Sequence, residues 1–147
     1  IPGNASFSLD LRAQSNDVMN ELSSRVEKIA VTLANHYDVN IQLSQAAYIA
    51  AAEVNAEATE MMSGAIKEVL GEEKHRPPII TTGGDDFHFY TLKRPHLKAT
   101  MLGLGCDLKP GLHDPHMTFE REALFKGVEV LTNVVVNTMN RLNNEII

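Results

Sequence analysis

The sequence contains one cysteine, no tryptophan and no apolar run of the length that a membrane-spanning helix needs, about 18 residues. A single thiol, Cys106, cannot form an internal disulfide, so we expect a reducing compartment such as the cytoplasm. Without a candidate spanning segment we expect no membrane partner. A secretory signal pattern is also missing. The first residues, IPGNASFSLDLR, have the pattern of a turn and a strand, which suggests a start inside a larger protein.

Basic charge is also scarce, because 13 Lys and Arg residues face 19 Asp and Glu residues, for a net charge of −6. A nucleic-acid or anionic-membrane partner generally requires a basic face, so we expect neither. The hydrophobic fraction is 44% and the charged fraction is 22%, as in ordinary globular proteins. A length of 147 residues allows one ordinary domain or two small ones.

The first 45 residues contain a strand-like pattern of apolar residues, then a helix-like pattern, then a second strand-like pattern. Residues 5–12 alternate apolar and polar side chains, which predicts a half-buried strand. Residues 15–17, Ser-Asn-Asp, can cap a helix, and apolar residues then recur at helical spacing to about His36. Residues 39–44 alternate again. The pattern predicts a strand–helix–strand unit in which one helix packs on a sheet.

The remaining residues are predicted to be mostly helical. A helix is expected from about Tyr48 to Leu70, with Gly71 ending it. A glycine turn and a short helix follow within residues 79–94, and residues 97–106 have the pattern of a buried strand. The last helix is expected to begin after Thr118, a suitable N-cap. The only composition shift that suggests a domain boundary lies near residues 45–48.

The loop KPGLHDPHMTFERE, residues 109–122, places His113 and His116 three residues apart. Asp114 could orient the His113 imidazole, as carboxylates do for metal-bound histidines. The local pattern leaves a second interpretation open, a loop histidine near a helix start, because the pair lacks the H-E-x-x-H spacing of a zinc site.

Two further groups have both a structural and a functional interpretation. Gly83 and Gly84 precede Asp85 and Asp86, which favours a turn and helix start over a phosphate site, because the acids repel phosphate. Arg12 shares the polar face of its predicted strand with an aspartate two residues earlier. A surface ion pair is the simpler interpretation, and a planar fork for a carboxylate ligand is the alternative.

Taken in order, three segments resemble the zinc-dependent amidohydrolase and carboxypeptidase superfamily. They are IPGNASFSLDLRAQSNDVMNEL, GGDDFHFY and LGLGCDLKPGLHDPHMTFEREAL. This superfamily includes aminoacylases, acetylornithine and succinyl-diaminopimelate deacetylases, N-carbamoyl amino acid hydrolases and allantoate amidohydrolases. The segments are most similar to the aminoacylase-like branch.

The resemblance implies an α/β fold, with a catalytic domain around a mixed β-sheet and an inserted α+β lid domain. Residues 1–45 would form the strand–helix–strand second half of the lid. Residues 46–147 would form the C-terminal part of the catalytic domain, with helices packed on a partial mixed sheet. The family's His-x-Asp motif, its glutamate base and most metal ligands have no counterpart here. We therefore expect a C-terminal fragment of a longer enzyme, inactive alone and without a catalytic residue of its own.

The resemblance also assigns roles to individual residues. His113 matches the family's last metal ligand, and Arg12 matches the lid arginine that binds the substrate's carboxylate. Gly83, Gly84 and Asp86 match a turn at the edge of the active site. That turn often reads Glu-Asp-Phe, and here it reads Asp-Asp-Phe.

The function that the resemblance implies is hydrolysis of the amide bond of N-acyl or N-carbamoyl amino acids or small peptides. The cofactors would be two divalent ions, zinc or else manganese, cobalt or nickel. The enzyme would be a homodimer joined through the lid, acting on a small-molecule substrate. The alternative is a non-catalytic dimerisation or binding module derived from the same family.

Overall fold

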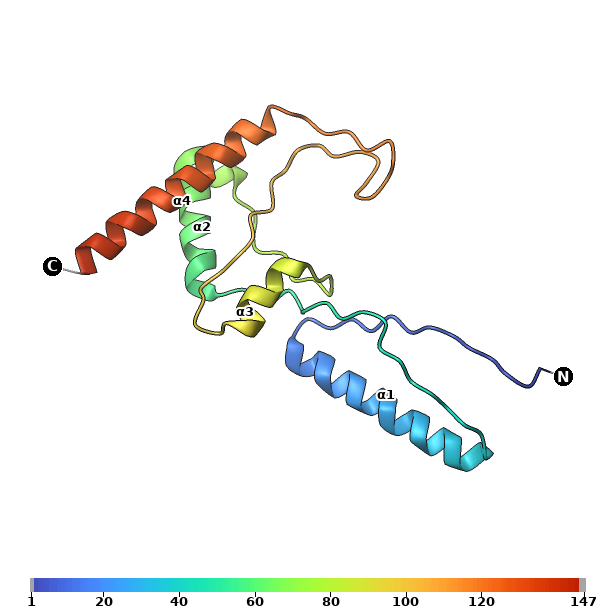
Figure 1. The fold of residues 1–147 in the computed structure, drawn as a ribbon. Helices are drawn as coiled ribbons and strands as arrows, with labels where there is room; N and C mark the ends of the chain where they lie inside the picture. The colour runs from blue at the N-terminus through green and yellow to red at the C-terminus, as the bar shows by residue number, and fades with distance from the viewer. Residues whose placement is uncertain (1, 146–147) are drawn as a thin grey trace. The chain divides into compact units, whose positions relative to one another are not determined.

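The computed structural model describes residues 2–145, and Figure 1 shows its helical elements. These are α1 (Asn16–Tyr37), α2 (Ala56–Leu70), η1 (Glu72–Lys74), η2 (Asp86–His88), α3 (Phe89–Lys93) and α4 (Ala123–Glu145). The chain divides into two compact units, each made of two segments. The first unit comprises Ile1–Glu53 and Ile79–Leu97, and the second comprises Val54–Pro78 and Lys98–Ile147.

The predicted α/β fold with a mixed sheet is wrong for the part of the chain that the structure describes. Residues 2–145 contain helices and two isolated β-bridges, and no sheet. The predicted strand at residues 5–12 is extended, but its apolar side chains face solvent, and Phe7 is 86% exposed. An extended segment becomes a strand only when a neighbour supplies the inter-strand hydrogen bonds. The alternation of residues 5–12 correctly predicts their extended conformation, but it contains no information about which strand, if any, pairs with them.

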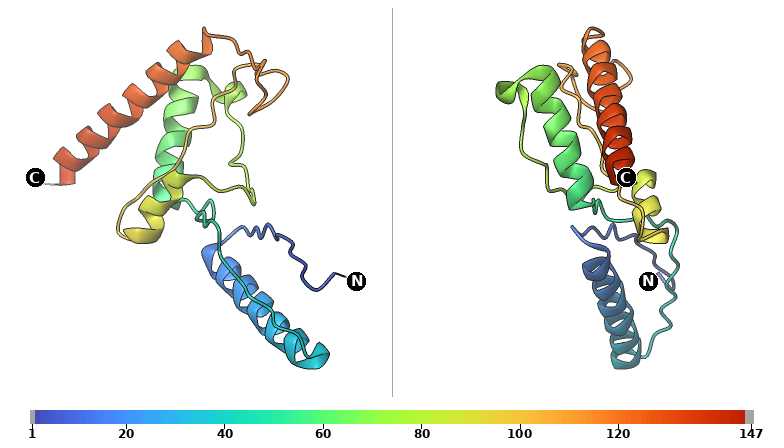
Figure 2. Two further views of the ribbon diagram at one scale, coloured as in Figure 1. Left: turned by 45° about the vertical axis from the view of Figure 1, so that its right-hand side comes forward. Right: turned by 90° about the vertical axis from the view of Figure 1, so that its left-hand side faces the viewer.

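The first unit is organised around α1. Ser15 caps this helix, because its hydroxyl accepts a hydrogen bond from the Val18 N–H. Asp38, which has a left-handed backbone, is the C-cap of α1, and the chain then returns beside the helix in an extended segment. Figure 2 shows this return in both views. A shallow groove lies between the two, with Ala30 and Ala34 on the helix and Val39 and Leu43 on the segment.

The second unit is built on the packing of α2 against α4 (Figure 1). The contact between the helices buries small and medium-sized side chains: Ala65 on α2 is 1% exposed, and Val130 on α4 is fully buried. Gly127 makes room for Leu104, which a β-carbon at that position would approach within 3.0 Å. The core is therefore a narrow seam between two helices.

Large apolar side chains remain exposed on the outer face of α4. They include Leu124, Phe125, Val128, Leu131, Val135, Met139 and Leu142. The helix is nevertheless not a membrane span: within residues 2–145, every helix is too short or too polar to cross a bilayer. Contiguous exposed apolar surface of this kind is typical of faces that pack against other polypeptide.

Candidate functional site

The loop that carries His113 is closed by a backbone neck. The Lys109 N–H donates to the Thr118 carbonyl at 3.0 Å, and the Thr118 N–H donates to the Lys109 carbonyl at 2.8 Å. A further bond, from the Glu120 N–H to the Cys106 carbonyl at 2.8 Å, extends this neck towards α4. The eight residues between Lys109 and Thr118 therefore project from a fixed base.

His113 has a left-handed backbone, with φ of 68°. This region is unfavourable for a residue with a β-carbon, and such strain is found disproportionately at functional positions. The imidazole is exposed. The loop thus presents His113 outward in a conformation that its own residue type does not favour.

Asp114 shapes this loop. Its Oδ1 accepts the His116 N–H at 2.8 Å and lies 3.5 Å from the His116 Nδ1. This is a local turn in which an aspartate side chain bonds the backbone two residues later. The carboxylate therefore contacts His116, whereas the sequence interpretation gave it the His113 imidazole as partner.

Gly84 in the glycine turn is required by close packing. It forms a bridge with Ala51, and a β-carbon added at Gly84 would lie 2.5 Å from the Ile49 Cγ2 and 2.7 Å from the Ala50 carbonyl. Gly83 is less confined, because its β-carbon would meet only the Thr81 side chain, at 3.2 Å for the nearest atom. The turn therefore depends on its second glycine for contact with the segment after α1.

The two aspartates that follow have different roles. Asp85 is the N-cap of η2, and its Oδ1 accepts the Phe87 N–H at 2.9 Å. Asp86 is the first residue of η2, and its side chain is exposed. The predicted short helix opened by acidic residues is confirmed, and Asp86 is exposed to solvent at its start.

His88, at the end of η2, is 4% exposed. Its Nδ1 is buried and has no hydrogen-bond partner among the described residues. A buried polar atom without a partner costs free energy, so such atoms are rare. In the sequence His88 lies near the glycine turn, and nothing in the local pattern indicates its burial.

Arg12 forms the ion pair with Asp10 that the alternation of residues 5–12 predicts. Its Nε and Nη2 both donate to the Asp10 Oδ2, at 3.0 and 2.8 Å. Both side chains are largely exposed. The hydrogen bond from Arg12, together with its positive charge, lowers the pKa of Asp10, and the same contact raises the pKa of Arg12. The pair is therefore fully charged at neutral pH.

Asn16 is a buried polar residue whose importance the sequence did not reveal. Its Nδ2 donates to the Glu53 Oε2 at 2.5 Å, and its Oδ1 accepts the Ala51 N–H at 3.0 Å. The Tyr48 hydroxyl also lies 3.4 Å from that Oδ1. Residues 15–17 had suggested helix capping alone, and Asn16 instead ties the start of α1 to the segment before α2.

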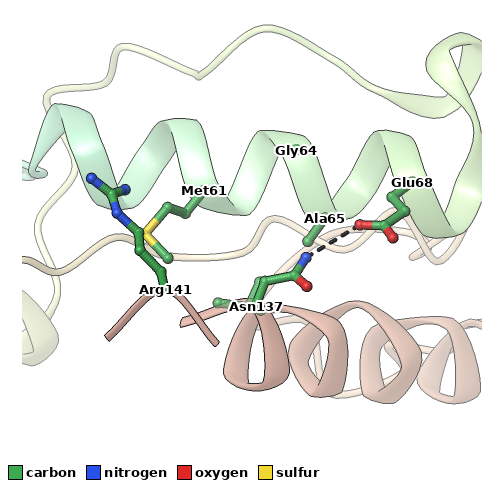
Figure 3. A pocket seen from close by; sticks show the side chains of 7 residues that line it. Met61, Gly64, Ala65, Glu68, Asn137 and Arg141 are labelled. Carbon is green, nitrogen blue, oxygen red and sulfur yellow. Dashed lines mark hydrogen bonds between the residues drawn. The ribbon is translucent and has the colours of Figure 1, made fainter. Parts of the chain in front are cut away.

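Figure 3 shows a groove of about 290 Å³ between α2 and α4. Its lining residues are Met61, Gly64, Ala65, Glu68, Val134, Asn137 and Arg141. Across it, the Asn137 Nδ2 donates to the Glu68 Oε2 at 3.2 Å. None of the site residues predicted from the sequence lines this groove, which belongs to the helix-packing seam.

The predicted site residues are distributed over both units. Arg12, Gly83, Gly84 and Asp86 lie in the first unit, and His113 lies in the second. Within the first unit, no hydrogen bond or ion pair between described residues joins Arg12 to the glycine turn. Nor do residues 2–145 contain a group of three or more His, Cys, Asp or Glu side chains that could hold a metal ion. The described residues alone therefore do not form a metal centre, and His113 can supply one ligand at most.

A comparison with protein-family models matches residues 8–137 to the model described as peptidase family M20/M25/M40. This range includes Arg12, the glycine turn and the His113 loop. No curated protein and no solved structure matches the chain.

Proposed function

Because this chain belongs to peptidase family M20/M25/M40, we propose that it is the C-terminal part of a two-metal amidohydrolase. The reaction would be hydrolysis of the amide bond of N-acyl or N-carbamoyl amino acids or small peptides. The observation that carries the proposal is the family match over residues 8–137, because it spans the Arg12 segment and the His113 loop in one alignment. The family makes this a peptidase- or amidohydrolase-type chain, and the substrate class is our inference.

His113 would be one ligand of that metal pair. Members of the family typically bind divalent metals, and a neutral imidazole suits zinc, manganese, cobalt or nickel. The exposed position of His113 on a loop with a fixed neck supports this role, because a ligand must be presented outward to meet others. The other ligands and the general base would come from residues outside this chain, since the described residues hold no metal-binding cluster.

Arg12 would bind the substrate's α-carboxylate, and the turn with Gly83, Gly84 and Asp86 would line the edge of the active site. A guanidinium presents paired N–H donors that match a carboxylate in a planar, charge-assisted contact. The exposure of Arg12 supports the assignment, because it leaves the side chain accessible to a ligand. Recognition of this carboxylate would favour N-acyl amino acids over plain amides.

We also propose a homodimer joined through residues 1–45. The exposed apolar side chains of this segment support it, with Phe7 on the first extended stretch and Val39 and Leu43 on the stretch after α1. Burial of such side chains against a second copy would be favourable, at about 25 cal/mol per Å² of apolar surface.

The test of the metal assignment is His113→Ala in the full-length protein. We expect loss of hydrolysis of an N-acetyl amino acid and a lower content of bound divalent metal by elemental analysis. His116→Ala is the matched control, because His116 lies in the same loop and is also exposed, and it should retain both. Full activity and unchanged metal content in His113→Ala would refute the role of His113. A wild-type protein that binds metal without any hydrolysis would indicate the non-catalytic module instead.

The test of the carboxylate assignment is Arg12→Ala, assayed on an N-acetyl amino acid and on its α-carboxamide. We expect KM to rise at least tenfold on the acid and little on the carboxamide, because only the acid offers an anion. Arg12→Lys should recover part of the loss, since it restores the charge without the planar fork. Equal effects on the two substrates would count against a carboxylate site.

A further inference from the structure

Asp10 contacts Arg12 through one edge of the guanidinium only. The single oxygen Oδ2 accepts from both Nε and Nη2, at 3.0 and 2.8 Å. These two nitrogens form one of the two edges of the planar fork that can present a pair of parallel N–H groups. The other edge, which consists of Nη1 and the second hydrogen of Nη2, makes no hydrogen bond with any residue in the described part of the chain.

We propose that Asp10 is a positioning residue, which holds Arg12 by its Nε edge and leaves the Nη1–Nη2 edge open for the substrate's carboxylate. This inference rests on the proposed role of Arg12 in carboxylate binding. Asp10 itself would not touch the substrate. It would act through the orientation of the guanidinium.

The benefit of Asp10 is conformational. A free arginine side chain has several rotatable bonds, and fixing them when a ligand binds opposes binding through lost entropy. Asp10 and Arg12 lie two residues apart in an extended segment, so both side chains point to the same side of the backbone. The contact fixes the fork in advance of the ligand.

Asp10 also has an opposing effect, because its negative charge lies beside the place where an anionic ligand would bind. If repulsion or competition for the fork dominated, removal of Asp10 would tighten carboxylate binding. If orientation dominates, removal would weaken it. The two possibilities predict changes of opposite sign, and the open second edge favours orientation, because the substrate need not displace Asp10.

The experiment uses Asp10→Ala and Asp10→Asn in the full-length protein, each assayed on an N-acetyl amino acid and on its α-carboxamide. For Asp10→Ala we expect KM on the acid to rise about two- to fivefold, the range typical of an exposed ion pair. We expect kcat, and KM on the carboxamide, to stay unchanged. Asp10→Asn keeps an oxygen acceptor and loses the charge, so it should return KM close to the wild-type value.

A second measurement is independent of catalysis. Solvent exchange of the Arg12 Nε–H, followed by ¹⁵N NMR, should be slow in the wild-type protein and faster in Asp10→Ala. A purely structural role of Asp10 would instead raise KM on both substrates and lower the thermal midpoint. Either that result, or an unchanged or lower KM on the acid, would overturn the proposal.

Arg12→Ala separates this inference from the proposed function. If Arg12→Ala is selective for the acid but Asp10→Ala is not, only the positioning role fails. If Arg12→Ala is not selective, the carboxylate site itself fails. In the double variant, Asp10→Ala should add nothing to Arg12→Ala, because the residue through which it acts is gone.

Discussion

Glu57, in the first turn of α2, forms an ion pair with Arg141 in the last turns of α4, with 3.2 Å between Oε1 and Nη2. The second oxygen of the same carboxylate accepts from the Lys98 Nζ at 2.6 Å. One side chain therefore links the start of α2, the end of α4 and the segment that precedes the His113 loop. The hydrogen bond from Lys98 is the largest cause of a lowered pKa at Glu57, and the charges of Lys98 and Arg141 add to it.

Glu57→Gln should therefore destabilise the second unit in a pH-dependent way. The pKa of Glu57 in the folded protein lies below its usual value of 4.5, so ionisation favours folding. This stabilisation is present above about pH 4.5 and is lost as the pH falls through the folded-state pKa. At pH 7 we expect the thermal midpoint of Glu57→Gln to fall by roughly 2–4 °C, measured by circular dichroism.

The difference between wild type and Glu57→Gln should shrink as the pH falls below 4.5 and through the lowered pKa of Glu57, because protonation removes the charge of the wild-type carboxylate. Glu60→Gln is the matched control on the same helix. Glu60 is exposed and has no ion pair recorded within the described residues. A difference that stays constant as the pH falls through the pKa of Glu57 would mean that packing rather than charge is responsible.

Gly84→Ala should destabilise the first unit by about 1–3 kcal/mol, the usual cost of forcing atoms into a packed site. The new β-carbon would lie 2.7 Å from a backbone oxygen, that of Ala50, which cannot move as a side-chain tip can. Chemical denaturation followed by circular dichroism measures the effect. Gly83→Ala is the control, because its β-carbon meets only the Thr81 side chain. Equal costs at the two glycines would contradict the packing argument.

Asn16→Ala should cost about 1–3 kcal/mol, because it removes the side-chain acceptor of the buried Ala51 N–H. Asn16→Asp should be more harmful at neutral pH, since it places a second carboxylate against Glu53. Unfolding in urea measures both changes. Asn20→Ala on the exposed side of α1 serves as the reference for loss of an asparagine from this helix. A cost at Asn16 no larger than that at Asn20 would show that the buried network contributes nothing.

His113→Gly should be more stable than His113→Ala by up to about 1.5 kcal/mol. Alanine keeps the strained left-handed conformation, which costs about 1–2 kcal/mol, whereas glycine relieves it and loses about 0.5–1 kcal/mol through backbone entropy. Thermal unfolding of the two variants makes the comparison. At Leu112, whose φ is not positive, the order of the same two substitutions should reverse. The same order at both positions would remove the evidence for strain at His113.

The helices were the part of the fold that the sequence predicted well. Ser15 caps α1 and Gly71, with φ of 92°, ends α2, as their residue types indicate. Each helical hydrogen bond joins residues four apart, so a short stretch of sequence contains the information. The predicted starts of two helices were wrong. Asn55 caps α2 well after Tyr48, and Thr118 pairs with Lys109 rather than capping α4.

The strands could not be predicted in the same way. Residues 5–12 and 39–44 alternate as strands do, but pairing depends on a partner that is distant in sequence. In the described residues that partner is missing, and the apolar side chains that should be half buried face solvent instead. The predicted division into residues 1–45, as half of a lid domain, and residues 46–147, as part of a catalytic domain, stays a prediction.

For the candidate site, the sequence indicated which residues to consider, but it did not predict most of their contacts. The Asp10–Arg12 pair follows directly from alternation, because both residues fall on one face. The left-handed backbone of His113 has only a weak local signal, because histidine is enriched among residues with positive φ but rarely adopts it, whereas a glycine would have indicated it. The sequence also could not predict which histidine the Asp114 carboxylate contacts. Two imidazoles lie within two residues of it, and the turn geometry decides between them.

Residues 110–117 of the His113 loop can be exchanged as one segment, because the backbone neck holds both of its ends. Two reciprocal backbone bonds between Lys109 and Thr118 fix the ends of the loop and use no side chain for the purpose. Substitutions, or whole loops of equal length from relatives, could therefore be grafted between these two positions without disturbing α4.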